Sequence, residues 1–190
     1  MTRLSIFLLF TISAMGFGSQ ALAISISLQP RSQLINLGET TSVDVMVSGF
    51  GDMTSPSLGA FDFDLSYDPF IIMPVSVRLG PHLGFGFFGS DTFGTPGMIH
   101  LDGVSLESSS DLNANQPGMF SLATYDFIGT GIGLSRIDFT FVSLSDEGGN
   151  SLADVSELGG SIRVPDGGST CFLLGIALLC VLSVRRRVYL

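Results

Sequence analysis

The clearest pattern along the chain is a strict alternation of apolar and polar side chains near residue 60. The apolar positions are Phe61, Phe63, Leu65 and Tyr67, and the polar ones are Asp62, Asp64 and Ser66. Successive side chains of a β-strand point to opposite faces of its sheet, so this period of two predicts a strand over residues 58–67 with one buried face. A slip of one residue would bury two aspartates, which is costly unless they are paired. The pattern therefore predicts the strand and also its register.

Seven further segments rich in Val, Ile, Phe, Thr and Ser are predicted strands, and no stretch has a sustained helical period. These strands cover residues 24–29, 41–50, 70–78, 98–106, 119–128, 134–144 and 160–164. The predicted loops at 51–57, 80–97, 107–116 and 146–149 are dense in turn-forming residues. About eight short strands separated by turns predict one all-β domain built as a sandwich.

The N-terminal segment has the parts of a secretory signal peptide. Arg3 supplies a positive charge, residues 4–12 are apolar, and Ala21-Leu22-Ala23 forms a small-x-small cleavage site. The apolar part is too short to span a bilayer comfortably, which favours cleavage. We therefore expect residues 1–23 to be a signal peptide and the exported domain to occupy residues 24–164, with Ile24 first.

The C-terminal tail, residues 165–190, has a different composition from the domain. It continues from Val164 as Pro165-Asp166-Gly167-Gly168-Ser169-Thr170, an apolar run over 171–184, and Arg185-Arg186-Arg187. The fourteen residues of this run form about 21 Å of helix, against a hydrocarbon core of roughly 30 Å. We expect a transmembrane segment at about 168–184 that is held briefly and cut, with the arginines on the cytoplasmic side. An ordinary single-pass anchor is the alternative.

Charge and cysteine usage exclude several classes of function for the domain. Residues 24–164 hold four arginines, no lysine and sixteen carboxylates, a formal charge of −12. Nucleic-acid binding requires a basic surface, so it is excluded. Both cysteines, Cys171 and Cys180, lie in the apolar run of the tail. The domain therefore has no disulfide, no cysteine nucleophile and no cysteine-ligated zinc.

Catalytic residues are not expected. Asp62 and Asp64 point from one face of one strand, where a solvated surface is the simplest interpretation and calcium binding or paired-carboxylate catalysis the alternatives. His100 lies on the same strand face as Asp102, so a His/Asp pair is geometrically possible, but no Gly-x-Ser-x-Gly elbow accompanies it. His82 follows Pro81 and is expected in a loop.

Calcium is the one cofactor that the residues allow. Asp146, Glu147 and Asn150 surround two glycines, which are the residue types that a calcium-binding turn uses. Asp68 and Asp154 are further candidate ligands from neighbouring loops. An ordinary hairpin turn, which uses the same residues, is the alternative.

The tail resembles the PEP-CTERM sorting signals of Gram-negative bacteria, and in particular their VPDSG-CTERM variant. Val164, Pro165, Asp166, Gly168, Ser169 and Thr170 agree with that pattern, and Gly167 stands where serine is usual. The resemblance implies that an exosortase-like enzyme recognises the tail after passage to the inner membrane. It also implies delivery to the cell surface or extracellular matrix.

Residues 58–69, Leu-Gly-Ala-Phe-Asp-Phe-Asp-Leu-Ser-Tyr-Asp-Pro, resemble the third-strand region of cohesin domains. The Phe-rich segment at 137–141 and the acidic glycine turn at 146–150 extend the resemblance. It implies a nine-stranded jelly-roll sandwich and, in cellulosomal members, binding of a dockerin module through one sheet face. Residues 80–97, with Phe85, Phe87, Phe88 and Phe93, have no counterpart in that pattern. This loop is either a packed cover or an apolar platform.

These observations predict a non-catalytic exported surface or matrix protein with a cohesin-like module. Its expected partners are an exosortase-like processing enzyme and a dockerin-like protein or extracellular polysaccharide. The alternatives are a glycan-active hydrolase with scattered carboxylates and a plain membrane-anchored structural protein. The chain has no Trp, the residue that most often stacks on sugar rings.

Overall fold

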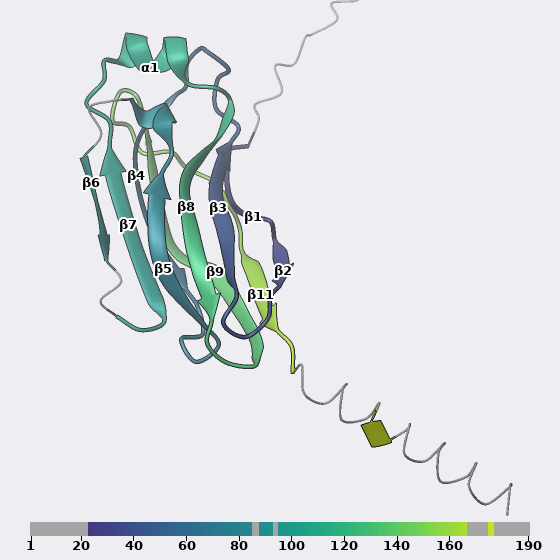
Figure 1. Ribbon diagram of the computed structural model, residues 1–190. Helices are drawn as coiled ribbons and strands as arrows, with labels where there is room; N and C mark the ends of the chain where they lie inside the picture. The colour runs from purple at the N-terminus through teal and green to yellow at the C-terminus, as the bar shows by residue number, and fades with distance from the viewer. Residues whose placement is uncertain (1–22, 85–87, 93–94, 167–174, 177–190) are drawn as a thin grey trace, which may run out of the picture.

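The computed structural model describes residues 23–84, 88–92, 95–166 and 175–176, and the domain within them consists of two β-sheets packed face to face (Figure 1). The five-stranded sheet has the order β10-β1-β3-β8-β5. Its strands are β10 (Ser156–Leu158), β1 (Ser25–Gln29), β3 (Thr40–Ser48), β8 (Met119–Gly129) and β5 (Ile72–Leu79). The six-stranded sheet has the order β2-β11-β9-β4-β7-β6. Its strands are β2 (Ser32–Leu34), β11 (Gly160–Val164), β9 (Gly133–Asp146), β4 (Leu58–Ser66), β7 (Met98–Val104) and β6 (Phe88–Thr92).

Both ends of the domain are bound into the sandwich. β1 pairs with β3 in one sheet, and β2, which follows it closely in sequence, lies in the other sheet. β11, the last strand, lies between β2 and β9, parallel to the first and antiparallel to the second. Two sheets with the first and last strands paired inside them confirm the predicted jelly-roll sandwich.

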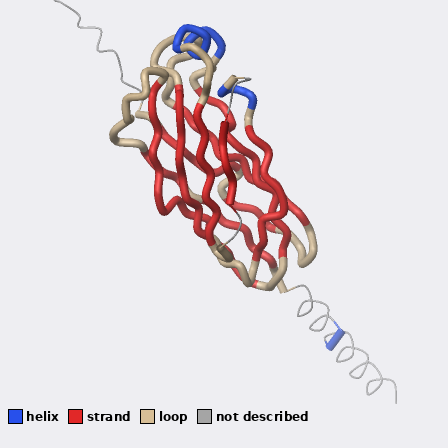
Figure 2. The backbone as a smooth tube through the Cα atoms, turned by 90° about the vertical axis from the view of Figure 1, so that its left-hand side faces the viewer, coloured by secondary structure: helices blue, strands red, loops and turns tan. Residues whose placement is uncertain are grey.

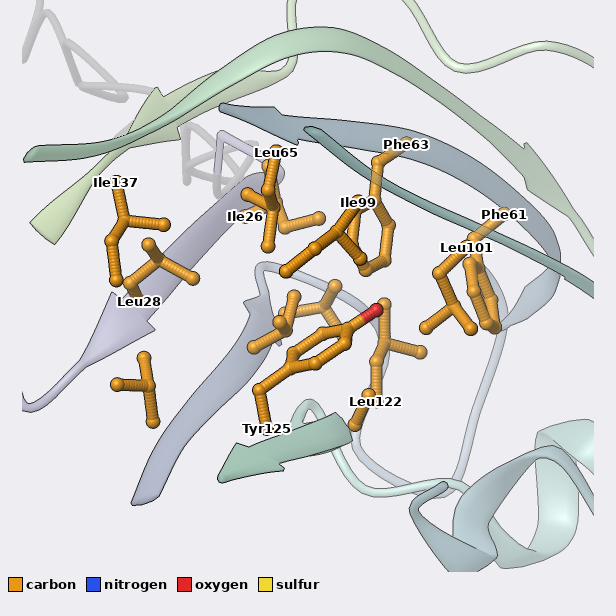
Figure 3. Packing of buried hydrophobic residues seen from close by; sticks show 14 of the residues in the cluster. Ile26, Leu28, Phe61, Phe63, Leu65, Ile99, Leu101, Leu122, Tyr125 and Ile137 are labelled. Atoms are coloured by element: carbon orange, nitrogen blue, oxygen red, sulfur yellow. The ribbon is translucent and has the colours of Figure 1, made fainter. Parts of the chain in front are cut away.

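The core forms where the apolar faces of the two sheets meet. Phe61, Phe63 and Leu65 of β4 are buried against β8, whose Tyr125 faces Phe63 in Figure 3. The Phe63 ring also meets Phe139 of β9 edge-on, with ring centroids 5.9 Å apart. Each fully buried aromatic or aliphatic side chain contributes about 1.5–3 kcal/mol of transfer free energy. The alternation around residue 60 thus supplies the centre of the core, as predicted.

Three short strands and one helix were not predicted. β2, β6 and β10 lie at sheet edges, where a strand needs no apolar face and so leaves no alternation in the sequence. The predicted loop at 107–116 contains the helix α1 (Ser109–Asn115). The Ser108 side chain caps α1 by accepting from the Asp111 N–H, and Leu112 is its buried residue.

The two ends of the sandwich differ. α1 and the 3-10 turn η1 (Pro81–Leu83) lie at the end where the chain enters β1, and the chain leaves β11 at the opposite end (Figures 1 and 2). In the part of the chain that the structure describes, no helix is long and apolar enough to cross a membrane. The predicted transmembrane segment lies outside the described residues except for 175–176.

Candidate functional site

A histidine and three aspartates meet on the outer face of the six-stranded sheet. The antiparallel pairing of β4 and β7 places Asp64 opposite His100 and Asp62 opposite Asp102. His100 Nδ1 lies 2.8 Å from Asp64 Oδ1 and 3.6 Å from Asp62 Oδ1, and its Nε2 lies 3.5 Å from Asp102 Oδ1. The expected pair of His100 and Asp102 is therefore part of a larger cluster.

The cluster has more negative charge than its histidine can balance. The hydrogen bond to Asp64 raises the pKa of His100, partial burial opposes that rise, and the charges of Asp62, Asp64 and Asp102 add to it. Three carboxylates around one imidazole leave a net charge of about −2 or −3, depending on the protonation of His100. The His100 side chain is 39% exposed, so the cluster is open to a partner.

Apolar side chains surround this cluster on the same face. The register pairs Phe141 of β9 with Asp64, Met98 of β7 with Ser66, and Val104 of β7 with Ala60. These three apolar side chains are exposed. We call the surface made by the four cluster residues and these three side chains the β4–β7 face. An acidic centre with an apolar rim can bind a cationic group and bury apolar area beside it.

On the outer face of the other sheet, one carboxylate is paired with an arginine. The Asp126 carboxylate accepts hydrogen bonds from Ser42 (2.6 Å) and Ser76 (2.7 Å) and forms an ion pair with Arg78 (2.5 Å). The Arg78 hydrogen bond, followed by those of the two serines, holds the pKa of Asp126 well below its usual range. This face therefore has less unbalanced charge to offer a partner than the β4–β7 face.

In the turn predicted to bind calcium, the Asp146 carboxylate accepts hydrogen bonds from other residues of the same turn. Asp146 Oδ1 accepts from the backbone N–H of Gly148 (2.9 Å) and of Asn150 (2.8 Å), and Oδ2 accepts from the Asn150 side chain (2.9 Å). The bonds from Asn150, side chain first, lower the pKa of Asp146. The residues are brought together as predicted, and a calcium ion here stays a prediction. Among the described residues, no group of three or more His, Cys, Asp or Glu side chains is arranged to hold a metal ion.

Glu147 connects this turn to two other segments. Its Oε1 accepts from Ser55 Oγ (2.6 Å) and from the Asn113 amide of α1, and its Oε2 accepts from the Ser57 N–H (2.9 Å). Burial alone would raise the pKa of Glu147, but these hydrogen bonds lower it. Asp68 follows β4 at the opposite end of the sandwich from Asp146. The suggestion that Asp68 joins the turn was wrong, because the antiparallel pairing of β4 and β9 puts Leu58 opposite Asp146 and the Ser66 end of β4 opposite Asp138.

A buried amide that the sequence did not indicate lies close to the same end. Gln116 is completely buried, and its Nε2 donates to the backbone oxygens of Leu58 and His82, both at 3.0 Å. Its Oε1 accepts from the Leu58 N–H. No pattern distinguishes this glutamine from the polar loop residues around it. Its role is to satisfy the backbone where β4 begins.

The remaining predicted positions are distributed over the two ends. His82 lies in η1, with its ring centroid 5.3 Å from that of Phe120. Ala23 is exposed beside the start of β1, while Ala21 lies outside the described residues. β11 ends at buried Val164, and Pro165 and Asp166 follow it. Gly167, Gly168 and Arg185–Arg187 lie outside the described residues, as do Phe85, Phe87 and Phe93 of the aromatic loop; Phe88 begins β6.

Comparison with known proteins identifies the tail and the fold separately. Residues 163–188 match the model of the VPDSG-CTERM motif. Comparison with curated proteins finds no match.

Solved cohesin structures are similar to the domain. A type I cohesin from Clostridium thermocellum, solved in complex with a dockerin, matches with a TM-score of 0.60 and 15% identity over 75% of this chain and 99% of its own. A non-cellulosomal cohesin from Archaeoglobus fulgidus gives 0.58 and 17%, over 79% and 96%. A type I cohesin from Pseudobacteroides cellulosolvens gives 0.59 and 16%, over 77% and 94%. The chain thus combines a domain of cohesin-like fold with a VPDSG-CTERM sorting motif.

Proposed function

We propose that this is a non-catalytic surface protein whose cohesin-like domain binds a protein partner through the β4–β7 face. The tail directs the exported chain to an exosortase-like enzyme at the inner membrane, which cuts the tail and passes the domain to the cell surface or matrix. The observation that supports the binding site is the exposed cluster of Asp62, Asp64 and Asp102 around His100. A dockerin-like module is the proposed partner, by analogy with the complex of the Clostridium thermocellum cohesin.

The chemistry of the face specifies what the partner must present. Three carboxylates favour a lysine or arginine, and the exposed Phe141, Met98 and Val104 favour an apolar side chain next to it. Arginine satisfies both demands, since its guanidinium can bind a carboxylate with two hydrogen bonds while its stem lies on apolar surface. The partner's contact surface should therefore have a basic centre with apolar residues around it.

The same geometry argues against hydrolytic chemistry at this cluster. Asp62, Asp64, Asp102 and His100 project from two neighbouring strands of one sheet face. General acid–base hydrolysis needs carboxylates on both sides of a scissile bond, in environments that separate their pKa values. A single sheet face supplies only one side.

Calorimetric titration of the mature chain with a panel of type I dockerin modules tests the proposal. We expect binding to at least one module, weakened about tenfold by Asp64→Asn combined with Asp102→Asn, which corresponds to about 1.4 kcal/mol. Asp44→Asn is the matched control, because Asp44 lies on the other sheet and accepts from Thr124 Oγ1. The control should bind like the unchanged chain.

Two results would contradict this assignment. Equal weakening by Asp44→Asn would show that net charge matters and the face does not. The second result is that no dockerin binds and that an acidic or neutral extracellular polysaccharide does. The partner would then be a glycan and not a protein.

A further inference from the structure

The end of the sandwich from which the tail leaves bears three exposed apolar side chains at loop tips. Leu37 lies in the loop between β2 and β3, Phe70 between β4 and β5, and Ile132 between β8 and β9. Phe70 is 86% exposed, the largest value among the exposed large apolar side chains of the described residues. We call these three residues the apolar tips. An aromatic ring so fully in water adds nothing to the core of this domain.

Hydrogen bonds join these loops to one another. The Gly38 N–H donates to the Gly129 oxygen (2.8 Å), and the Gly129 N–H donates to the Glu39 oxygen (3.0 Å). The N–H of Thr130 donates to the Ile71 oxygen (2.9 Å), and the Asp68 carboxylate accepts from the Phe70 N–H (2.9 Å). Such bonds hold the three tips in fixed relative positions, as an interaction surface requires.

The C-terminal end of β11, the last strand of the domain, lies at the same end of the sandwich. The Ile35 N–H donates to the Arg163 oxygen (3.0 Å). A Cβ placed on Gly129 would lie 3.0 Å from the Asn36 oxygen and 3.2 Å from Val164 Cγ2. The loops carrying Leu37 and Ile132 therefore touch the residue at which the sorting motif begins.

The length of the tail determines what this end faces. Asp166 follows the end of β11 by two residues, and the apolar run begins at Cys171, five residues later. Five residues span at most about 18 Å when fully extended. A tail inserted in the bilayer thus keeps this end of the sandwich within about 18 Å of the hydrocarbon, close to the lipid headgroups, whose layer is roughly 5–7 Å thick on each side.

We propose that the apolar tips enter the outer surface of the membrane while the tail is still attached. This inference rests on the proposed membrane-held state of the tail. Apolar side chains at an interface bury themselves at the boundary between headgroups and acyl chains. With three points of contact the domain stands with its β1 entry end away from the membrane, and Val164-Pro165-Asp166 lies at the membrane surface. The processing enzyme then contacts the motif at a fixed distance from the membrane surface.

The absence of tryptophan from the chain permits a direct test. The full-length precursor carrying Phe70→Trp is reconstituted in vesicles of phosphatidylethanolamine and phosphatidylglycerol, with and without brominated acyl chains. Leu106→Trp is the matched control, since Leu106 is an exposed apolar residue of the loop between β7 and α1 at the opposite end. We expect F70W emission to shift to the blue and to lose most of its intensity with brominated lipid. L106W emission should do neither.

The outcomes separate this inference from the function on which it rests. Precursor that floats with the vesicles while F70W remains unquenched leaves the membrane-held tail intact and overturns the role of the tips. Precursor that fails to float overturns both. A blue shift without bromine quenching means that the tips contact a second copy of the chain, which also overturns the membrane proposal.

Discussion

Replacing Gln116 with leucine removes an amide that satisfies buried backbone groups at the start of β4. The Gln116 side chain binds both the N–H and the oxygen of Leu58, a residue with no exposed surface, and it also donates to the His82 oxygen. Leucine has a similar volume, so it fills the space and keeps water out. The polar groups then remain buried without these partners.

The cost follows from the number of groups affected. Each buried backbone group that loses its hydrogen bond costs about 1–3 kcal/mol, so the two groups of Leu58 give about 2–6 kcal/mol for Gln116→Leu. Gln116→Ala should cost less than this, although it deletes more atoms. It opens a polar space with three hydrogen-bonding partners, which a water molecule can occupy.

Urea unfolding of residues 24–166, followed by far-UV circular dichroism, measures both changes. Domain stabilities are commonly about 5–15 kcal/mol, so a loss of this size is resolved easily. A Gln116→Leu variant within about 1 kcal/mol of the unchanged domain would show that the Leu58 groups do not depend on this amide. A Gln116→Ala variant less stable than Gln116→Leu would show that lost packing outweighs the lost hydrogen bonds.

Two further predictions concern the cluster and the tail. The hydrogen bond to Asp64 raises the pKa of His100 above its ordinary value of 6.5, so an NMR titration should find it above that value and Asp64→Asn should lower it. Because the folded pKa is the higher one, the stabilisation by His100 is complete below the unfolded pKa and is lost as pH rises through the folded value. His100→Gln should abolish this loss, and a His100 that titrates at or below 6.5 would contradict the geometry. Replacing Arg185–Arg187 with glutamine should leave the tail uncut, which intact-mass measurement of the exported protein reports; normal processing would show that these charges are dispensable.

The sequence predicted the elements that bury an apolar face. β4 could be found, with its register, because Phe61, Phe63 and Leu65 alternate with aspartates whose burial would be costly. The edge strands β2 and β10 could not be found, since a three-residue strand at an edge needs only backbone partners. α1 was missed because its helical character depends on a serine cap and on one buried leucine, Leu112, within an otherwise polar segment.

The candidate site was predictable only in part. The spacing of Asp62 and Asp64 puts them on one face, as does that of His100 and Asp102, and both follow from the period of two. These two pairs meet only because β4 lies beside β7 in one specific register. That register depends on residues that are far apart in the sequence. Phe141 joins them only because a register shift between Asp64 and Leu65 changes how β9 is aligned. None of these facts is local in sequence.

In the proposed export of the chain across the inner membrane, the position of β11 sets an order of events. The six-stranded sheet is incomplete until its final strand is inserted between β2 and β9, and that strand is the last part of the domain to be translocated. The sheet can therefore close only when Val164 has emerged on the far side of the membrane. The domain therefore completes its fold only after its translocation is finished. A cut made after Val164 removes nothing that either sheet uses, so the domain can be released without unfolding.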